Sequence, residues 1–270
     1  MPELIAHRDR LSLVVEIGGM PVRVNTSDPD FLDMLCTRYD GFLGVTDHAE
    51  IEFDVDLSAP KPGRDGPVRV VRRSGRWLLQ RGDFRAEWEP ARRRGQILQF
   101  PNPYSIDSVL RIVHTLVLAE QGGFLAHAAS AIRNGKAFLF AGVSGAGKTT
   151  MSRLAPRDVS LLTDEISYVR RQNNRYIACG TPFTGELAKV GENVSAPIAG
   201  LYLLAKGSET RIEPLKSGVA TRELLANILF FAQDAELVRM VFDSACNFVD
   251  RVPVSRLTFV PDSRVWEMIG

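Results

Sequence analysis

A lysine and two threonines follow a glycine-rich turn in the middle of the chain, and these residue types can hold phosphate groups. The segment 142–149 reads Gly-Val-Ser-Gly-Ala-Gly-Lys-Thr and fits the pattern G-x-x-x-x-G-K-[ST]. Its three glycines allow positive φ and leave no Cβ to block a close approach of the backbone. Successive backbone N–H groups then form an anion-binding nest at the start of the following helix. We expect Lys148 to reach the β- and γ-phosphates of a nucleoside triphosphate, and the Thr149 hydroxyl to hold Mg²⁺.

The flanks of this turn favour a phosphate-binding loop over a chance glycine turn. A predicted strand, 136–141, enters it, and a short helical pattern leaves it and stops before Pro156. The expected ligands are ATP, with GTP as the alternative, and Mg²⁺. The predicted nucleotide-binding residues are Gly142, Val143, Ser144, Gly145, Ala146, Gly147, Lys148, Thr149 and Thr150.

An acidic pair, Asp164-Glu165, ends an apolar run one short crossover after Lys148. That spacing allows one helix and a return to a neighbouring strand, the smallest right-handed βαβ unit. The strand would then end beside the glycine-rich turn, where an acid can coordinate Mg²⁺ or accept a proton. The alternative is an ordinary surface turn that begins with two acids.

His127 lies in a predicted strand, 124–132, that precedes the strand entering the glycine-rich turn. Asn134-Gly135 between the two strands is typical of a tight hairpin turn, so the strands should pair antiparallel. His127 should then lie near one end of the hairpin, although the sequence does not fix which end faces the nucleotide. A histidine packed in the core is the alternative.

The first hundred residues predict a small, mainly antiparallel β domain with one helix. Strands are expected at 11–17, 21–24, 51–57, 68–71, 77–80, 84–88 and 96–100, with a helix that begins at Asp28-Pro29. This segment is rich in arginine, which is typical of solvated strand faces. A docking surface for an acidic partner and a nucleic-acid surface are the alternatives. Its arginines include Arg69, Arg72, Arg73, Arg76, Arg81, Arg85, Arg92, Arg93 and Arg94.

Pro101 to Pro103 mark a predicted boundary between domains 1–100 and 101–270. A strongly periodic helix follows from Ser105 and ends at Gly122-Gly123. Further strands are expected at 159–163, 166–169, 176–179, 198–204 and 253–259, and a helix at 221–232.

Composition limits the classes of protein that need consideration. The 270 residues carry a net charge of +1, which gives no overall attraction to nucleic acid or to anionic lipid. Three widely spaced cysteines argue against a disulfide framework or a structural zinc site and for a reducing compartment. The N-terminus has no long apolar run. We therefore expect a cytoplasmic protein.

Several of these motifs together resemble the HPr kinase/phosphorylase superfamily, and more closely the HPr-kinase-like proteins of bacterial gene clusters, including those that phosphorylate ribosomal peptides. The resemblance rests on the segments 124–130, 142–149, 161–165, 180–183 and 195–204. It implies an α+β chain whose α/β phosphate-loop core is related to phosphoenolpyruvate carboxykinase. By this resemblance Asp164 is the general base, His127 orients it and Glu165 faces the metal. Glu186 matches an acid near the metal.

The family's glutamate-isoleucine-arginine-glycine stretch, which is tied to the reverse reaction, is replaced here by a segment without arginine, 185–191. We therefore expect neither phosphorolysis nor HPr as the substrate. The resemblance implies an ATP-dependent kinase that acts on a Ser- or Thr-type hydroxyl of a protein, a peptide or a small molecule. A switch-type nucleoside triphosphatase and a non-catalytic nucleotide sensor are the alternatives. The sequence leaves the phosphoacceptor and the oligomeric state open.

Overall fold

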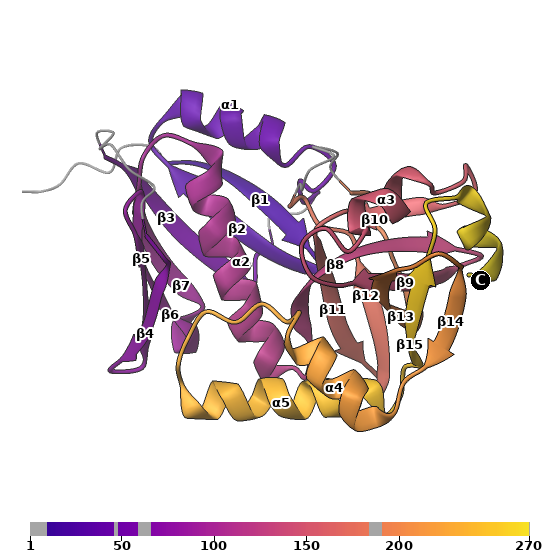
Figure 1. Ribbon diagram of the computed structural model, residues 1–270. Coiled ribbons are helices and arrows are strands. Elements are labelled where there is room, and N and C mark those ends of the chain that lie inside the picture. Colours follow the sequence, from indigo (N-terminus) through magenta and orange to yellow (C-terminus); the bar gives the residue numbers. More distant parts are fainter. Residues whose placement is uncertain (1–9, 46–47, 59–65, 184–190, 270) are drawn as a thin grey trace, which may run out of the picture. The chain divides into compact units, whose positions relative to one another are not determined.

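The computed structural model describes residues 10–45, 48–58, 66–183 and 191–269. The chain is a mixed α+β protein with two sheets and few helices in this part (Figure 1). It divides into two compact units, residues 1–113 with 231–234 and residues 114–230 with 235–270. Glu186 lies outside the described residues. None of the helices in the described ranges is long and apolar enough to cross a membrane.

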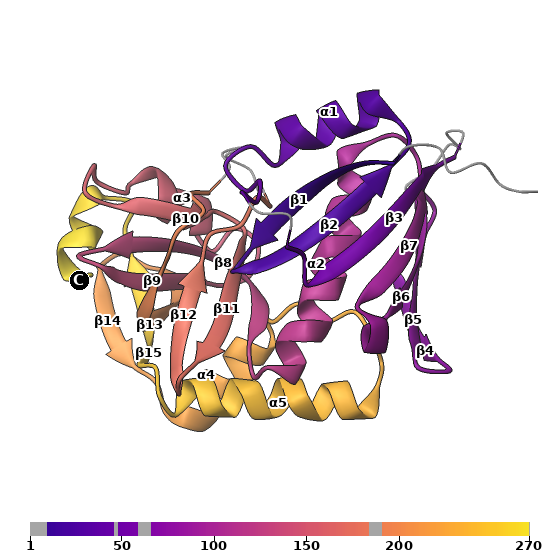
Figure 2. The same ribbon diagram turned by 180° about the vertical axis from the view of Figure 1, so that it is seen from behind.

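The described part of the N-terminal unit contains a seven-stranded, mainly antiparallel sheet, as expected. The strand order is β1-β2-β3-β7-β6-β5-β4, and β3 pairs parallel with both of its neighbours. Helix α1 (Pro29–Arg38) lies along β1 and β2, as Figure 2 shows from behind. The strands are β1 (Leu11–Ile17), β2 (Met20–Thr26), β3 (Ile51–Leu57), β4 (Arg69–Arg73), β5 (Arg76–Arg81), β6 (Phe84–Glu89) and β7 (Arg94–Gln99), and a short 3-10 helix, η1 (Pro90–Arg92), precedes β7.

Local sequence explains these elements. Gly18 and Gly19 join β1 to β2 with φ of 63° and 77°, a turn that glycine adopts without steric cost. Asp28 caps α1, because its carboxylate accepts a hydrogen bond of 2.8 Å from the backbone N–H of Phe31. The strands alternate between buried apolar and exposed polar residues, so one face of the sheet carries the core.

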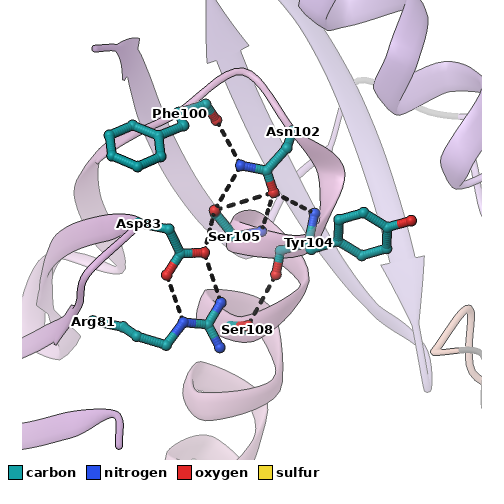
Figure 3. Close-up of polar contacts among 7 residues, drawn as sticks. All are labelled: Arg81, Asp83, Phe100, Asn102, Tyr104, Ser105 and Ser108. Carbon is teal, nitrogen blue, oxygen red and sulfur yellow. Dashed lines mark hydrogen bonds and ion pairs between the residues drawn. The ribbon is translucent and has the colours of Figure 1, made fainter. Parts of the chain in front are cut away.

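A buried polar network connects the β5–β6 turn to the start of α2 (Pro103–Glu120) (Figure 3). Asp83 accepts hydrogen bonds of 2.5 and 2.8 Å from the Arg81 guanidinium and of 2.7 Å from the Ser105 hydroxyl. Asn102 in turn accepts hydrogen bonds from the backbone N–H groups of Tyr104 and Ser105. Burial raises the pKa of Asp83, but the hydrogen bonds from Arg81 and Ser105 outweigh it, and the net shift is downward.

The second unit is built around one long strand, β8 (Phe124–Arg133). It pairs antiparallel with β9 (Lys136–Ala141) on one side and, on the other, first with β11 and then with β10. The sheet continues from β11 through β12, β13 and β15 to β14, and β9 also pairs parallel with β13. The remaining elements are α3 (Lys148–Arg153), β10 (Ser160–Thr163), β11 (Ile166–Gln172), β12 (Arg175–Cys179), β13 (Ser195–Lys206), β14 (Arg211–Pro214), α4 (Ser217–Leu225), α5 (Ala235–Val249), β15 (Val254–Phe259) and η2 (Ser263–Met268).

Aromatic packing fixes α3 against this sheet. The Trp266 ring packs edge-on against Phe140 of β9 at 5.3 Å, and its indole N–H donates to the carbonyl of Met151 in α3 at 3.2 Å. Both aromatic residues are almost fully buried. Buried aromatic pairs add about 1 kcal/mol beyond their area. This cluster therefore holds both ends of the segment that joins β9 to α3.

Two expectations about this unit are wrong. The helix expected at 221–232 begins at Ser217 and ends at Leu225, and α5 was not expected. Beyond Leu225 the backbone pairs with β8 instead, since the N–H of Leu229 donates to the carbonyl of Leu125 at 2.8 Å. In addition, β10 is not a neighbour of β9, because β8 lies between them. The two compact units divide inside α2, between Val113 and His114, and the domain boundary expected at Pro101 to Pro103 stays a prediction.

Candidate functional site

The glycine-rich loop, residues 142–149, connects the end of β9 to the first turn of α3. It is compact, since the N–H of Ala146 donates to the carbonyl of Val143 at 3.0 Å. Gly145 and Gly147 have φ of 75° and 116°, a region that residues with a Cβ rarely adopt. A Cβ on Gly147 would also lie 2.7 Å from the Phe259 ring. The loop therefore requires glycine for conformation at Gly145 and for both conformation and space at Gly147.

Lys148 is the first residue of α3, and its side chain turns back onto the loop. The ammonium donates to the carbonyl oxygens of Gly142 at 2.7 Å and Val143 at 3.3 Å. The residue is 9% exposed. Burial lowers the pKa of Lys148, and the charge of nearby Glu165 acts in the opposite direction. A mostly buried cation is thus held by neutral oxygens beside a carboxylate.

Asp164 and Glu165 form the turn between β10 and β11. The Thr163 hydroxyl fixes this turn, because it accepts hydrogen bonds of 3.2 Å from the N–H groups of both Glu165 and Ile166. Asp164 is buried and Glu165 is half-buried. On the far side of the turn, the Thr181 hydroxyl donates to the carbonyl of Ile166 at 3.0 Å. Neither threonine could be recognised from sequence, since a support of this kind leaves no pattern.

His127 lies on β8 where this strand changes partner. It is opposite Ile166 of β11, while Ser130, three residues later, is opposite Thr163 of β10. The acidic turn between those two strands therefore lies beside His127. On the other side of β8, Ala128 is opposite Ala141, the last residue before the glycine-rich loop. The structure thus decides which end of the hairpin carries His127: it is the end from which the loop emerges.

These residues line one cleft with a volume of about 380 Å³. It brings His127 and the acidic turn together with the loop and α3, all within the second unit. Three predicted loop residues, Gly142, Val143 and Ala146, do not line it; the Ala146 side chain packs in the core instead. The residues that line the cleft are His127, Ser144, Gly145, Gly147, Lys148, Thr149, Thr150, Arg153, Asp164 and Glu165.

Arg153 is the cleft residue that the sequence analysis missed. It is the last residue of α3, is exposed, and lies four residues after Thr149, one turn further along the same helix face. That spacing is the signal that could have identified it. Among the described residues, no group of three or more His, Cys, Asp or Glu side chains could by itself hold a metal ion.

A protein-family model described as "SynChlorMet cassette protein ScmC" matches residues 103–270, which is more than half of the chain. The chain belongs to this family. The ScmC match begins at the first residue of α2, so it includes every residue of the cleft and excludes the seven strands of the N-terminal sheet.

Two further comparisons identify no additional family for the chain. None of the curated proteins compared with the chain matches it. A solved structure of the Hpr(Ser) kinase/phosphatase from Coxiella burnetii aligns with 44% of this chain and 92% of its own, at 16% identity and a TM-score of 0.25. Such a low TM-score does not establish a shared fold.

Proposed function

We propose that the cleft binds ATP and that the protein is a kinase that transfers the γ-phosphate to a Ser- or Thr-type hydroxyl. The observation that carries this proposal is the convergence of three chain segments on one cleft. The glycine-rich loop supplies a lysine and a threonine, the β10–β11 turn supplies two carboxylates, and β8 supplies His127. Phosphoryl transfer needs a phosphate cradle, a metal ligand and a residue that positions the nucleophile, and this cleft contains candidates for each.

Lys148 and the loop backbone would hold the triphosphate. The ammonium now contacts the carbonyls of Gly142 and Val143, which are neutral oxygens. Anionic phosphate oxygens are stronger acceptors for an ammonium than carbonyls are. Nucleotide binding would therefore exchange these contacts for charge-assisted ones and relieve the cost of the buried cation.

The oxygen donors in the cleft suit Mg²⁺, and we assign the ion to the Thr149 hydroxyl and the Glu165 carboxylate. Protein Mg²⁺ sites commonly use one or two carboxylates and complete the shell with water and substrate phosphates. When bound, Mg²⁺ would neutralise charge on the β- and γ-phosphates.

Asp164 would act as the general base. Asp164 is buried in the wall of the cleft, and His127, which lines the same cleft, would orient its carboxylate. As the acceptor oxygen bonds to the γ-phosphorus, the bond from phosphorus to the β–γ bridging oxygen breaks and ADP leaves. The proton of the hydroxyl passes to Asp164. Proton removal of this kind contributes about 10²- to 10⁴-fold to the rate, and positioning contributes more.

The test is transfer of label from γ-labelled ATP with Mg²⁺ to short serine peptides, free serine and the products of neighbouring genes. Wild type should produce a stable labelled phosphate ester on the acceptor. Asp164→Asn should still bind ATP, but its rate of phosphoryl transfer should fall about 10²- to 10⁴-fold. Asp158→Asn is the matched control, because Asp158 is an exposed carboxylate that pairs with Arg133 at 3.0 Å. Full activity in Asp164→Asn would refute the base assignment. Release of free phosphate alone would indicate a nucleoside triphosphatase, and binding without turnover a nucleotide sensor.

A further inference from the structure

The arginines of the N-terminal sheet differ in whether a carboxylate neutralises them. One group forms ion pairs with carboxylates of the same unit: Arg92 lies 3.4 Å from Glu89, and Arg93 lies 2.8 Å from Glu50. This group consists of Arg76, Arg81, Arg92, Arg93 and Arg94. Its positive charge is therefore compensated locally.

A second group surrounds a small hollow of about 170 Å³ at the β4 end of the same sheet. Within the described ranges, Arg69 and Arg73 of β4 have no ion pair, and Arg85 of β6 approaches Glu87 only to 3.8 Å. All three guanidinium groups belong to exposed residues. We call this surface, made by Arg69, Val71, Arg73, Leu78 and Arg85, the β4 basic patch.

Strand register explains how charge and apolar surface combine in the β4 basic patch. Arg69, Val71 and Arg73 alternate along β4 and so share one face of the sheet. Val71 is opposite Leu78 of β5, and both are only half-buried. The two arginines of β4 are about 13 Å apart along the strand, with the apolar pair between them. The patch thus presents positive, apolar and positive positions in a line.

We propose that the β4 basic patch docks an extended acidic peptide segment of a partner, with an acidic, an apolar and an acidic residue at alternate positions. An extended chain has the same two-residue repeat as β4, so its side chains on one face match the line of the patch. The apolar residue would cover Val71 and Leu78, and the two carboxylates would meet Arg69 and Arg73. A long polyanion such as nucleic acid fits less well, because two carboxylates, Glu87 and Glu89, lie on β6, the strand that also carries Arg85. This inference does not depend on the proposed kinase activity.

The test is fluorescence anisotropy with a labelled peptide of sequence Gly-Glu-Ser-Leu-Ser-Glu-Gly, with free ends blocked, and the full-length protein without nucleotide. The double variant Arg69→Gln/Arg73→Gln should bind about tenfold more weakly than wild type. Arg92→Gln/Arg93→Gln removes the same charge from η1 and its C-cap in the same unit and should bind as wild type does. A peptide with glutamine in place of both glutamates should lose binding, and so should the original peptide at about 500 mM salt.

Thermal unfolding of both double variants checks that the sheet remains folded. Equal weakening in the two variants would show that only overall charge matters and would overturn the proposal. Absence of binding to wild type at low salt would also overturn it, as would equal binding of a peptide whose two glutamates are adjacent.

Discussion

The buried carboxylates of the N-terminal unit differ from the charged groups of the cleft in the kind of partner they have. Asp83 and Asp107 each accept two hydrogen bonds from one arginine, and a Ser or Tyr hydroxyl donates a third. In the cleft, Lys148 has a carboxylate nearby but donates to two backbone carbonyls. Removal of one partner from a buried charge pair is strongly destabilising, whereas a buried cation held by neutral acceptors can exchange them for an anion. We therefore assign the first group to the stability of the fold and, in line with the proposed function, the second group to ligand binding.

The largest effect that distinguishes the two groups is expected from Lys148→Ala, which should impair phosphoryl transfer and not stability. It should lower phosphate transfer from ATP by at least about 10³-fold, since the ammonium is assigned to the charge that develops on the phosphates. The midpoint of thermal unfolding should not fall, because within the described ranges the buried ammonium forms no ion pair and is held only by two neutral carbonyls. Lys136→Ala is the control, since Lys136 is an exposed lysine on β9, the strand that enters the loop. A large loss of stability with unchanged transfer would reverse the roles assigned to the two regions.

Asp83→Ala should show the opposite behaviour. It should lower the free energy of unfolding by about 3 kcal/mol, because it leaves Arg81 without its carboxylate and the Ser105 hydroxyl without its acceptor. ATP binding to the second unit should be unchanged. Urea unfolding measures the first quantity and isothermal titration the second. A variant as stable as wild type would show that the network in Figure 3 contributes little to the fold.

A third effect, which develops gradually with pH, is expected from His114, a buried ionisable group that is neutral at pH 7. In the described part of the chain neither ring nitrogen has a hydrogen-bond partner, and the ring packs edge-on against Tyr168 at 5.5 Å. Burial lowers the pKa of His114 to about 4, below its unfolded value of about 6.5. As the pH falls, the histidine is therefore protonated in the unfolded chain before it is protonated in the folded chain. The free energy of unfolding should fall by up to about 3 kcal/mol between pH 6.5 and pH 4.

The measurement is the unfolding free energy of wild type and His114→Phe between pH 7 and pH 4. The variant keeps an aromatic ring at this position and should lose less stability over the range. Parallel curves would show that His114 does not cause the pH dependence.

Much of the fold could be predicted from local sequence. Asn134-Gly135 and Gly18-Gly19 fix their hairpins because the turn itself demands positive φ, and the structure confirms both. The end of the hairpin that carries His127 could not be predicted, since it depends on β10 and β11 dividing β8 between them. The same holds for the pairing of individual arginines, which depends on strand order across the sheet. Arrangements that join distant segments leave no periodic signal in any one of them.

The most direct test of the central claim is isothermal titration of the full chain with ATP, with and without Mg²⁺. Our account predicts that one ATP binds per chain in a Mg²⁺-dependent manner, that Lys148→Ala abolishes binding, and that Asp164→Asn retains it. Absence of ATP binding to wild type, or binding that Lys148→Ala leaves unchanged, would contradict the account.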